Sequence, residues 1–206
     1  MVRDPRIQRL VDRLAGDRPG LEARRALSPL PHRGRLSSEV PGHARPAAVL
    51  MLLVPEDRLW MPLMRRTQVD GDQHSGQIAL PGGSFESGEN AAQAALRETY
   101  EELGLSSDGM DVLGELDPQW IPVSGFVVHP VVATVGMREE MTCDPKEVEH
   151  GFWVDVDRLR RSPIHEREGS RGDRRFTMRG WELAEGYLWG ATAMMLAELF
   201  AMLSED

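Results

Sequence analysis

The feature that most constrains this chain is an unbroken apolar run of eight residues, AAVLMLLV, at 47–54. Such a run leaves no polar positions for a solvent-facing side, so it predicts a strand that is buried on both faces. The next segment, RLWMPLMRR, follows a turn at 55–57 and predicts the antiparallel partner of that strand. The run is too short for a bilayer, which takes about 20 apolar residues. Other elements must therefore cover both faces of a sheet.

Helices alternate with further strands along the rest of the chain. Apolar spacing at 6–14 predicts a helix, and the proline-rich segment after it predicts an irregular arm with one short helical turn around 20–27. We expect residues 1–45 to form this helix and arm, packed on one domain of residues 46–206. Interleaved strands and helices predict an α/β fold with helices on both faces of a mixed sheet. The remaining expected elements are a helix at 90–103, an apolar C-terminal helix, strands near 110–116, 126–136 and 151–156, and a polar, arginine-rich stretch at 157–175.

Charge and cysteine content narrow the classes of function. The formal net charge is −9, which argues against sequence-independent binding to nucleic acid or to acidic membranes, because both need Lys and Arg to neutralise phosphates. Cys143 is the sole cysteine, so the chain has neither an intrachain disulfide nor a thiolate metal site. The first residues carry charges where a signal peptide needs an apolar core. We therefore expect a cytoplasmic protein with a small-molecule partner, and we consider a homodimer.

The helix at 90–103 carries the residues best suited to chemistry. Glu98, Glu101 and Glu102 stand at i, i+3 and i+4, so they share about one-third of its circumference. We expect Arg97 to pair with one of these glutamates at a time. Ala92, Leu96, Thr99 and Leu103 are expected to form the core face, while Ala91, Ala94 and Ala95 are expected to lie beside the glutamates and leave room for a ligand.

Three crowded carboxylates repel one another, and a divalent cation would turn that repulsion into a binding site. Carboxylate oxygens are hard ligands that suit Mg²⁺ or Mn²⁺. The alternative for a Glu-Glu pair alone is a solvated helix face. The wider spacing favours the cation: from Gly83 the chain has five residues, Glu89, seven residues, Arg97-Glu98-Thr99, one residue, Glu101-Glu102, one residue and Gly104-Leu105. This is the Nudix box, and the chain resembles a Nudix hydrolase.

The resemblance implies a Nudix-type α/β/α sandwich that hydrolyses a diphosphate with Mg²⁺ or Mn²⁺. It implies that Glu98, Glu101 and Glu102 are catalytic and hold the metal, together with the backbone carbonyl of Gly82. It also implies that Glu89 and Arg97 brace the loop against the helix. The general base stays open among Glu101, Glu147 and Glu149.

Residues 63–83, LMRRTQVDGDQHSGQIALPGG, resemble the additional motif of the coenzyme A diphosphatase branch. Arg66, Thr67, Gly76, Pro81, Gly82 and Gly83 match it, whereas Leu80 replaces a phenylalanine, Asp72 replaces a basic residue, and the variable stretch is one residue longer. The resemblance implies cleavage of coenzyme A, or an acyl-coenzyme A, to 3′,5′-ADP and 4′-phosphopantetheine. The expected substrate-binding residues are Arg66, Thr67, His74 and Gly76.

Two alternatives stand beside this function. One is a Nudix enzyme for ADP-ribose or another nucleoside diphosphate derivative, and the other is a non-catalytic nucleotide-sensing module. A further open question concerns the arginines that follow the last expected strand, which either hold the 3′-phosphate of coenzyme A or lie in a solvated loop. These are Arg158, Arg160, Arg161, Arg167, Arg171, Arg174 and Arg175.

Overall fold

The computed structural model describes residues 4–16, 18–32, 39–69 and 75–204, apart from the side chains of 171 and 174. His74 and Asp72, which the sequence analysis named, lie outside the described residues. The helices are α1 (Pro5–Leu14), α2 (Gly20–Arg25), α3 (Ala91–Leu103), α4 (Val156–Arg161) and α5 (Gly190–Leu203). The strands are β1 (Arg45–Pro55), β2 (Leu59–Arg66), β3 (Ile78–Ala79), β4 (Gly82–Ser84), β5 (Asp111–Glu115), β6 (Gln119–Ile121), β7 (Phe126–Thr134), β8 (Val148–Asp155), β9 (His165–Arg171), β10 (Arg174–Leu183) and β11 (Gly186–Trp189).

The expected apolar strand is β1, and it lies at the centre of a mixed sheet. It pairs in parallel with β7 along one edge and antiparallel with β2 and β4 along the other. The main path of the sheet is β3-β2-β1-β7-β5, with β8 added to β2 and β6 added to β7. The α/β prediction is thus confirmed, as are the antiparallel pair β1–β2 and the strands expected near 110–116, 126–136 and 151–156.

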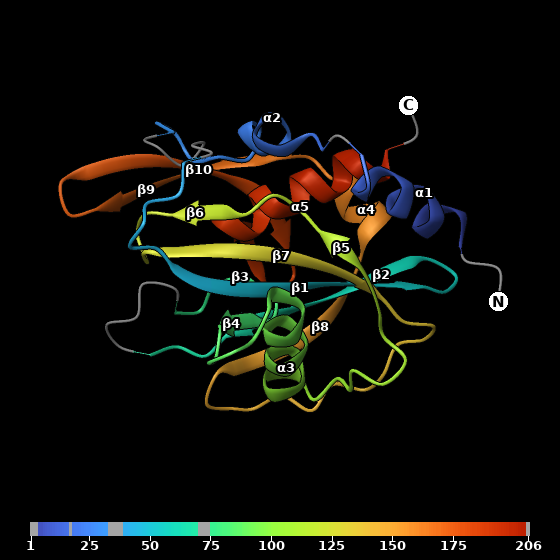
Figure 1. Cartoon of the computed structure of the whole chain (residues 1–206). Coiled ribbons are helices and arrows are strands. Elements are labelled where there is room, and N and C mark those ends of the chain that lie inside the picture. Colours follow the sequence, from blue (N-terminus) through green and yellow to red (C-terminus); the bar gives the residue numbers. More distant parts are fainter. Residues whose placement is uncertain (1–3, 17, 33–38, 70–74, 205–206) are drawn as a thin grey trace.

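Side chains of β1 alternate between two apolar cores, which explains why its sequence has no polar positions. Met51 and Leu53 face a core shared with α5, whereas Leu50 and Leu52 face a core shared with α3. Figure 1 shows α3 on one side of the sheet and α5 on the other. The predicted three-layer arrangement is therefore present.

The box helix α3 has well-defined ends. Asn90 and Gln93 form a reciprocal capping box, in which each side chain accepts a hydrogen bond from the other residue's backbone N–H. At the other end Gly104 adopts a left-handed conformation with φ 69°, as expected for a glycine that ends a helix. These two signals fix where the glutamates stand relative to the sheet.

The buried face of α3 differs from the predicted one. Ala91, Ala94 and Ala95 are buried against the sheet and leave no room for a ligand, so that expectation was wrong. Small side chains allow the helix backbone to approach β1 closely, which hydropathy alone does not reveal. Thr99 and Leu103 are buried as expected, whereas Ala92 and Leu96 are only partly buried.

The arginine-rich stretch at 157–175 forms ordered structure. It contains α4, β9 and the start of β10, and β9 pairs with β10 in a second sheet of order β11-β10-β9. Cross-strand ion pairs join Arg167 to Glu182 and Arg179 to Glu166. Strand β9 has no apolar side chain, so no apolar alternation marked the first strand of this hairpin in the sequence.

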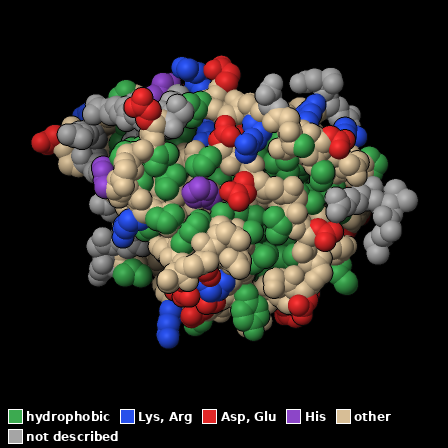
Figure 2. Space-filling view, in the orientation of Figure 1, with side chains coloured by type: hydrophobic (Ala, Val, Ile, Leu, Met, Phe, Trp, Pro, Cys, Tyr) green, Lys and Arg blue, Asp and Glu red, His purple; other side chains and the backbone are tan. Residues whose placement is uncertain are grey.

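The N-terminal helices pack on the C-terminal one. Ile7 and Leu10 of α1 are buried in the same core as α5, and Arg24 of α2 forms an ion pair with Glu198 of α5. Both of these charged side chains are almost fully buried, at 1 % and 0 % exposure. No helix in the described ranges is long and apolar enough to cross a membrane. On the face drawn in Figure 2, acidic and basic side chains of the described residues intermingle.

Candidate active site

Two glycines bring the loop before α3 into direct contact with its glutamates. The backbone N–H of Gly82 donates a hydrogen bond to Oε2 of Glu102 at 2.8 Å. A Cβ on Gly83 would overlap the carboxyl group of Glu98, and a Cβ on Gly82, which has φ 152°, would overlap the carbonyl oxygen of Ala48. Only glycine therefore fits at position 82, whereas a side chain at position 83 would displace the Glu98 carboxyl group.

Glu102 is a buried carboxyl group whose contacts do not fully offset the cost of removing it from water. Its side chain is 2 % exposed, and its Oε1 atom has no hydrogen-bond partner among the described residues. The nearest cation is Arg66, whose Nη1 lies 3.7 Å from Oε1. Burial raises the pKa of Glu102 from 4.5 to about 8, against the Gly82 hydrogen bond and the charge of Arg66. A bound cation would supply the missing partner.

Arg97 contacts three carboxylates at once, so the expectation of one pair at a time was wrong. Its Nε and Nη2 atoms donate to Glu89 at 2.7 and 3.0 Å, and Nη1 donates to both Glu98 and Glu101 at 3.0 Å. Nη2 also donates to the carbonyl of Ser84, which joins the loop to the helix. The predicted Glu89–Arg97 brace is confirmed. The Arg97 hydrogen bond lowers the pKa of Glu89 to about 2, whereas burial raises the pKa of Glu98.

The carboxyl groups of Glu98, Glu101 and Glu102 do not point at one common position. In the described part of the chain, no three carboxylate, imidazole or thiol groups already surround one point. Arg97 holds Glu98 and the 55 %-exposed Glu101, while Glu102 turns toward Gly82. The site therefore offers the oxygen donors that a hard cation prefers, on the C-terminal half of a single helix.

A β-bulge separates two of the candidate bases, since Glu147 precedes β8 and Glu149 lies within it. Along β2 and β8, Arg65 pairs with His150 but Arg66 pairs with Val148, which leaves Glu149 as the extra residue. The Glu149 carboxylate lies 3.3 Å from Nε of Arg65. The turn that carries Glu147 is bonded to α3, because the N–H of Asp144 donates to the carbonyl of Glu102 at 3.1 Å. Burial is the main cause of the raised pKa values of Glu98 and Glu102, and the negative charge of Glu147 adds to it.

Three of the expected substrate-binding residues, Arg66, Thr67 and Gly76, lie between the end of β2 and the start of β3. Arg66 ends β2 beside Glu102. The N–H and the hydroxyl of Thr67 donate hydrogen bonds to the carbonyls of Glu147 and Pro145, in the turn before β8. Gly76 has a left-handed φ of 68° in the turn before β3, where a side chain would press on Gln68. These positions bring Arg66 and Thr67 to the glutamates.

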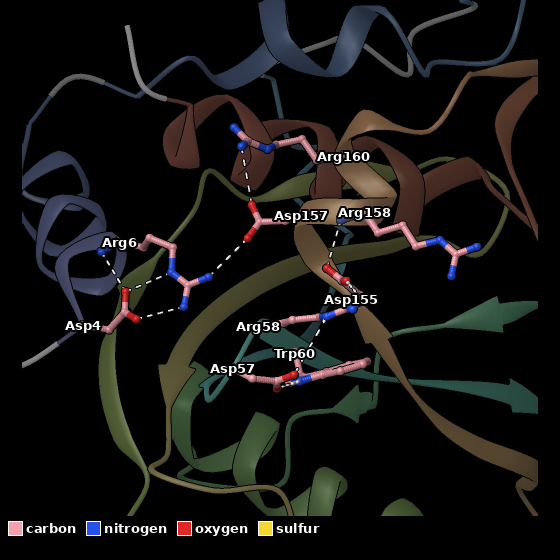
Figure 3. A network of polar contacts seen from close by, with 9 residues as sticks. All are labelled: Asp4, Arg6, Asp57, Arg58, Trp60, Asp155, Asp157, Arg158 and Arg160. Carbon is pink, nitrogen blue, oxygen red and sulfur yellow. Dashed lines mark hydrogen bonds and ion pairs between the residues drawn. The ribbon is translucent and has the colours of Figure 1, made fainter.

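The candidate arginines of α4 lie at the far end of the sheet. Arg58 precedes β2 and Arg66 ends it, and eight residues of extended strand span about 26 Å. A hollow of about 670 Å³ opens at the Arg58 end, and Arg158 and Arg161 line it. Figure 3 shows the polar network beside it, in which Arg160 pairs with Asp157. The distance of α4 from the glutamates, together with the ion pair of Arg160, favours the solvated alternative for these arginines.

Comparisons with known proteins agree with this fold. The NUDIX domain family model matches residues 43–179. The uncharacterised Nudix hydrolase NudL of Citrobacter koseri is 32 % identical over 158 residues, which cover 75 % of this chain and 81 % of that protein. The peroxisomal coenzyme A diphosphatase ndx-8 of Caenorhabditis elegans is 33 % identical over 96 residues, 45 % of this chain and 41 % of that protein. The MutT protein of Methanosarcina mazei superposes with a TM-score of 0.51 at 16 % identity, covering 79 % of this chain and 96 % of that one.

The chain belongs to the Nudix family. It is accordingly a hydrolase of diphosphate linkages, in a family that generally requires divalent metal ions.

Proposed function

We propose that this diphosphatase cleaves coenzyme A, or an acyl-coenzyme A, into 3′,5′-ADP and 4′-phosphopantetheine or its acylated form. The observation that carries the proposal is the position of Arg66, within 3.7 Å of Glu102, at the start of the segment that resembles the coenzyme A branch. The partial match to the coenzyme A diphosphatase of Caenorhabditis elegans supports the same substrate class.

Glu98, Glu102 and Glu101 would hold Mg²⁺ or Mn²⁺ with the carbonyl of Gly82. The fit rests on the buried Glu102 Oε1 atom that has no hydrogen-bond partner among the described residues, and on the carboxyl group of Glu98 held against Gly83. When bound, such an ion neutralises diphosphate oxygens and lowers the pKa of a water molecule. Glu98 would exchange its contact with Arg97 for this ion, while Arg97 keeps its two bonds to Glu89.

Two further residues complete the proposed mechanism. Arg66 binds diphosphate oxygens, since its planar guanidinium can donate two parallel hydrogen bonds beside the glutamates. Glu147 accepts the proton of the attacking water, because its turn is bonded through Asp144 to the backbone of Glu102, whereas Glu149 is engaged with Arg65. General-base catalysis of this kind contributes about 10²–10⁴-fold.

A substrate panel tests the proposal. Coenzyme A, 3′-dephospho-coenzyme A and ADP-ribose are incubated with the protein in Mg²⁺, and products are identified by mass spectrometry. We expect the highest kcat/KM for coenzyme A, with 3′,5′-ADP as a product. Preferred cleavage of ADP-ribose would instead support the first alternative substrate, and binding without cleavage of any of them would support a sensor. Glu98→Gln and Glu102→Gln should each lower kcat by roughly 10²-fold, which assigns the turnover to this site; the exposed Glu140→Gln is the control.

A further inference from the structure

We infer that Thr67 is a positioning residue, which holds Glu147 at the glutamate site instead of contacting the substrate. This inference rests on the proposed function, since it concerns the group proposed as general base. Thr67 follows β2 directly, at the point where the strand ends beside Glu102. Both polar groups of Thr67 that can donate a hydrogen bond are directed at the turn that carries Glu147.

The turn at 144–147 is tightly folded and is tied to β2 by Thr67. Within it, the N–H groups of Glu147 and Val148 both donate to the carbonyl of Asp144, at 3.1 and 2.8 Å. The N–H of Thr67 donates to the carbonyl of Glu147 at 2.9 Å, and its Oγ1 donates to the carbonyl of Pro145 at 3.1 Å. Two bonds from one residue therefore fix both ends of the short segment 145–147.

The same segment is tied to the box helix from the other side. The N–H of Thr142 donates to the carbonyl of Leu103 at 2.8 Å, and the N–H of Asp144 donates to the carbonyl of Glu102 at 3.1 Å. These bonds satisfy carbonyls at the C-terminal end of α3, which have no partner inside the helix. The segment thus bridges β2 and α3, and Thr67 supplies the β2 side of that bridge.

This arrangement explains how an irregular segment can hold a base in register with two glutamates on a helix. The bulge at Glu149 shifts the register of the ladder, which then continues to the backbone bond between Thr67 and Glu147 and ends there. The hydroxyl of Thr67 adds a side-chain bond beyond that point, to the carbonyl of Pro145. A small displacement of a base lowers the rate of the chemical step while leaving substrate affinity intact.

Thr67→Val tests the role of the hydroxyl, since it keeps the shape and the backbone bond and removes only the bond to Pro145. We expect kcat to fall about 2- to 10-fold, the range for one hydrogen bond, with KM unchanged. Thr67→Ser should recover most of kcat. Amide hydrogen exchange at Glu147 and Val148, measured without metal or substrate, should be faster in Thr67→Val.

A double-mutant cycle with Glu147→Gln identifies the partner. If Thr67 acts through Glu147, Thr67→Val should cause no further loss of kcat in the Glu147→Gln background. The matched control is Thr134→Val, which removes a hydroxyl bond of 2.8 Å to the Leu53 carbonyl away from the site, and which should leave kcat unchanged.

Three results would overturn the inference: a raised KM with normal kcat in Thr67→Val, additive losses in the cycle, or unchanged amide exchange at Glu147 and Val148. A failure of the proposed base is a separate result. If Glu147→Gln alone retains full kcat, Glu147 is not the base, and amide exchange then decides whether Thr67 still holds the turn.

Discussion

At the scale of single residues, Glu102 and Arg66 pair a buried carboxyl group with a cation that does not reach hydrogen-bond distance. Burial of Glu102 favours its neutral form, and Arg66, the cation paired with it among the described residues, lies beyond hydrogen-bond distance at 3.7 Å. A group of this kind costs the metal-free protein stability whenever it ionises. We therefore expect this pair to couple the proposed metal binding and substrate binding to the ionisation of Glu102.

The pH dependence of stability without metal follows from Glu102. Its folded pKa of about 8 lies above the unfolded value of 4.5, so the folded state binds more protons between these values. Its contribution to stability is fully present below about pH 4.5 and is lost as pH rises through about 8. In chelator, wild type should lose stability relative to Glu102→Gln over this window, measured by urea unfolding. Mg²⁺ at pH 9 should selectively stabilise wild type, and parallel pH profiles for the two proteins would contradict the assignment.

Arg66 makes a second prediction at this scale. Because it lies beside the metal-site carboxylate, we expect Arg66→Ala to lower kcat/KM by about 1.5–3 kcal/mol, the usual worth of a charged hydrogen bond. The loss should be equal for coenzyme A and 3′-dephospho-coenzyme A, since the proposed contact is to the diphosphate. A loss confined to coenzyme A would place the contact at the 3′-phosphate instead. Arg65→Ala is the matched control, because among the described residues Arg65 pairs with Glu149 and not with a glutamate of α3.

At the scale of elements, the loop before α3 and the helix act as one unit. Glu89 accepts the N–H of Glu86 at 2.7 Å as well as two bonds from Arg97, which in turn binds the Ser84 carbonyl. The brace thus holds Gly82 and Gly83 against the glutamates. Its removal is expected to disturb the loop and the metal site together.

Glu89→Gln tests the brace. The substitution preserves shape and removes the charge that pairs with Arg97, so both Tm and kcat should fall. Thermal unfolding by circular dichroism and a steady-state assay measure the two effects on the same sample. Glu86→Gln is the control, because only the backbone of Glu86 enters the brace. A normal Tm with a reduced kcat would mean that Glu89 acts in the chemistry directly.

The elements also show where sequence patterns stop being informative. The long strand β1 and the ends of α3 were predictable, because an apolar run, a capping pair and Gly104 each have a local physical cause. The buried side of α3 was not, because Glu102 is buried by contact with Gly82 and Arg66, which lie at least 20 positions away. The hairpin β9–β10 was missed for a different reason, since β9 has no apolar side chain and its charged residues pair with those of β10 across the strands.

At the scale of the whole molecule, the N-terminal segment is fastened to the domain by a buried ion pair. Arg24 donates to Glu198 and to the carbonyls of Asp117 and Pro118, and Glu198 also accepts the N–H of Asp117. Every charge there has a hydrogen-bonded partner, so removing one of them leaves the other buried and unpaired.

Arg24→Met should therefore lower the free energy of unfolding by about 3–5 kcal/mol, the typical cost of breaking a buried pair. The turnover per folded molecule should stay unchanged, since this pair lies on the α5 side of the sheet and the glutamates lie on the α3 side. Urea unfolding and an assay below the transition measure both quantities. The double variant Arg24→Met/Glu198→Leu should regain part of the loss. Equal stability of Arg24→Met and wild type would contradict this account.

The site as a whole was predictable in its reaction and less so in its details. Fixed spacing from Gly83 to Leu105 pointed to the family, the glutamates and the brace, because carboxylates at i, i+3 and i+4 share one side of a helix. The proposal of Glu147 over Glu149 depends instead on a bulge of one residue, and no local pattern signals such a bulge. Substrate identity depends on side chains that come together only in the folded chain.

The most direct test of the central claim is the initial rate of coenzyme A cleavage as a function of free Mg²⁺, starting from protein stripped of metal in chelator. The glutamate site predicts no turnover in chelator and a saturable recovery as Mg²⁺ is added. Full turnover of coenzyme A in the metal-free buffer would contradict it.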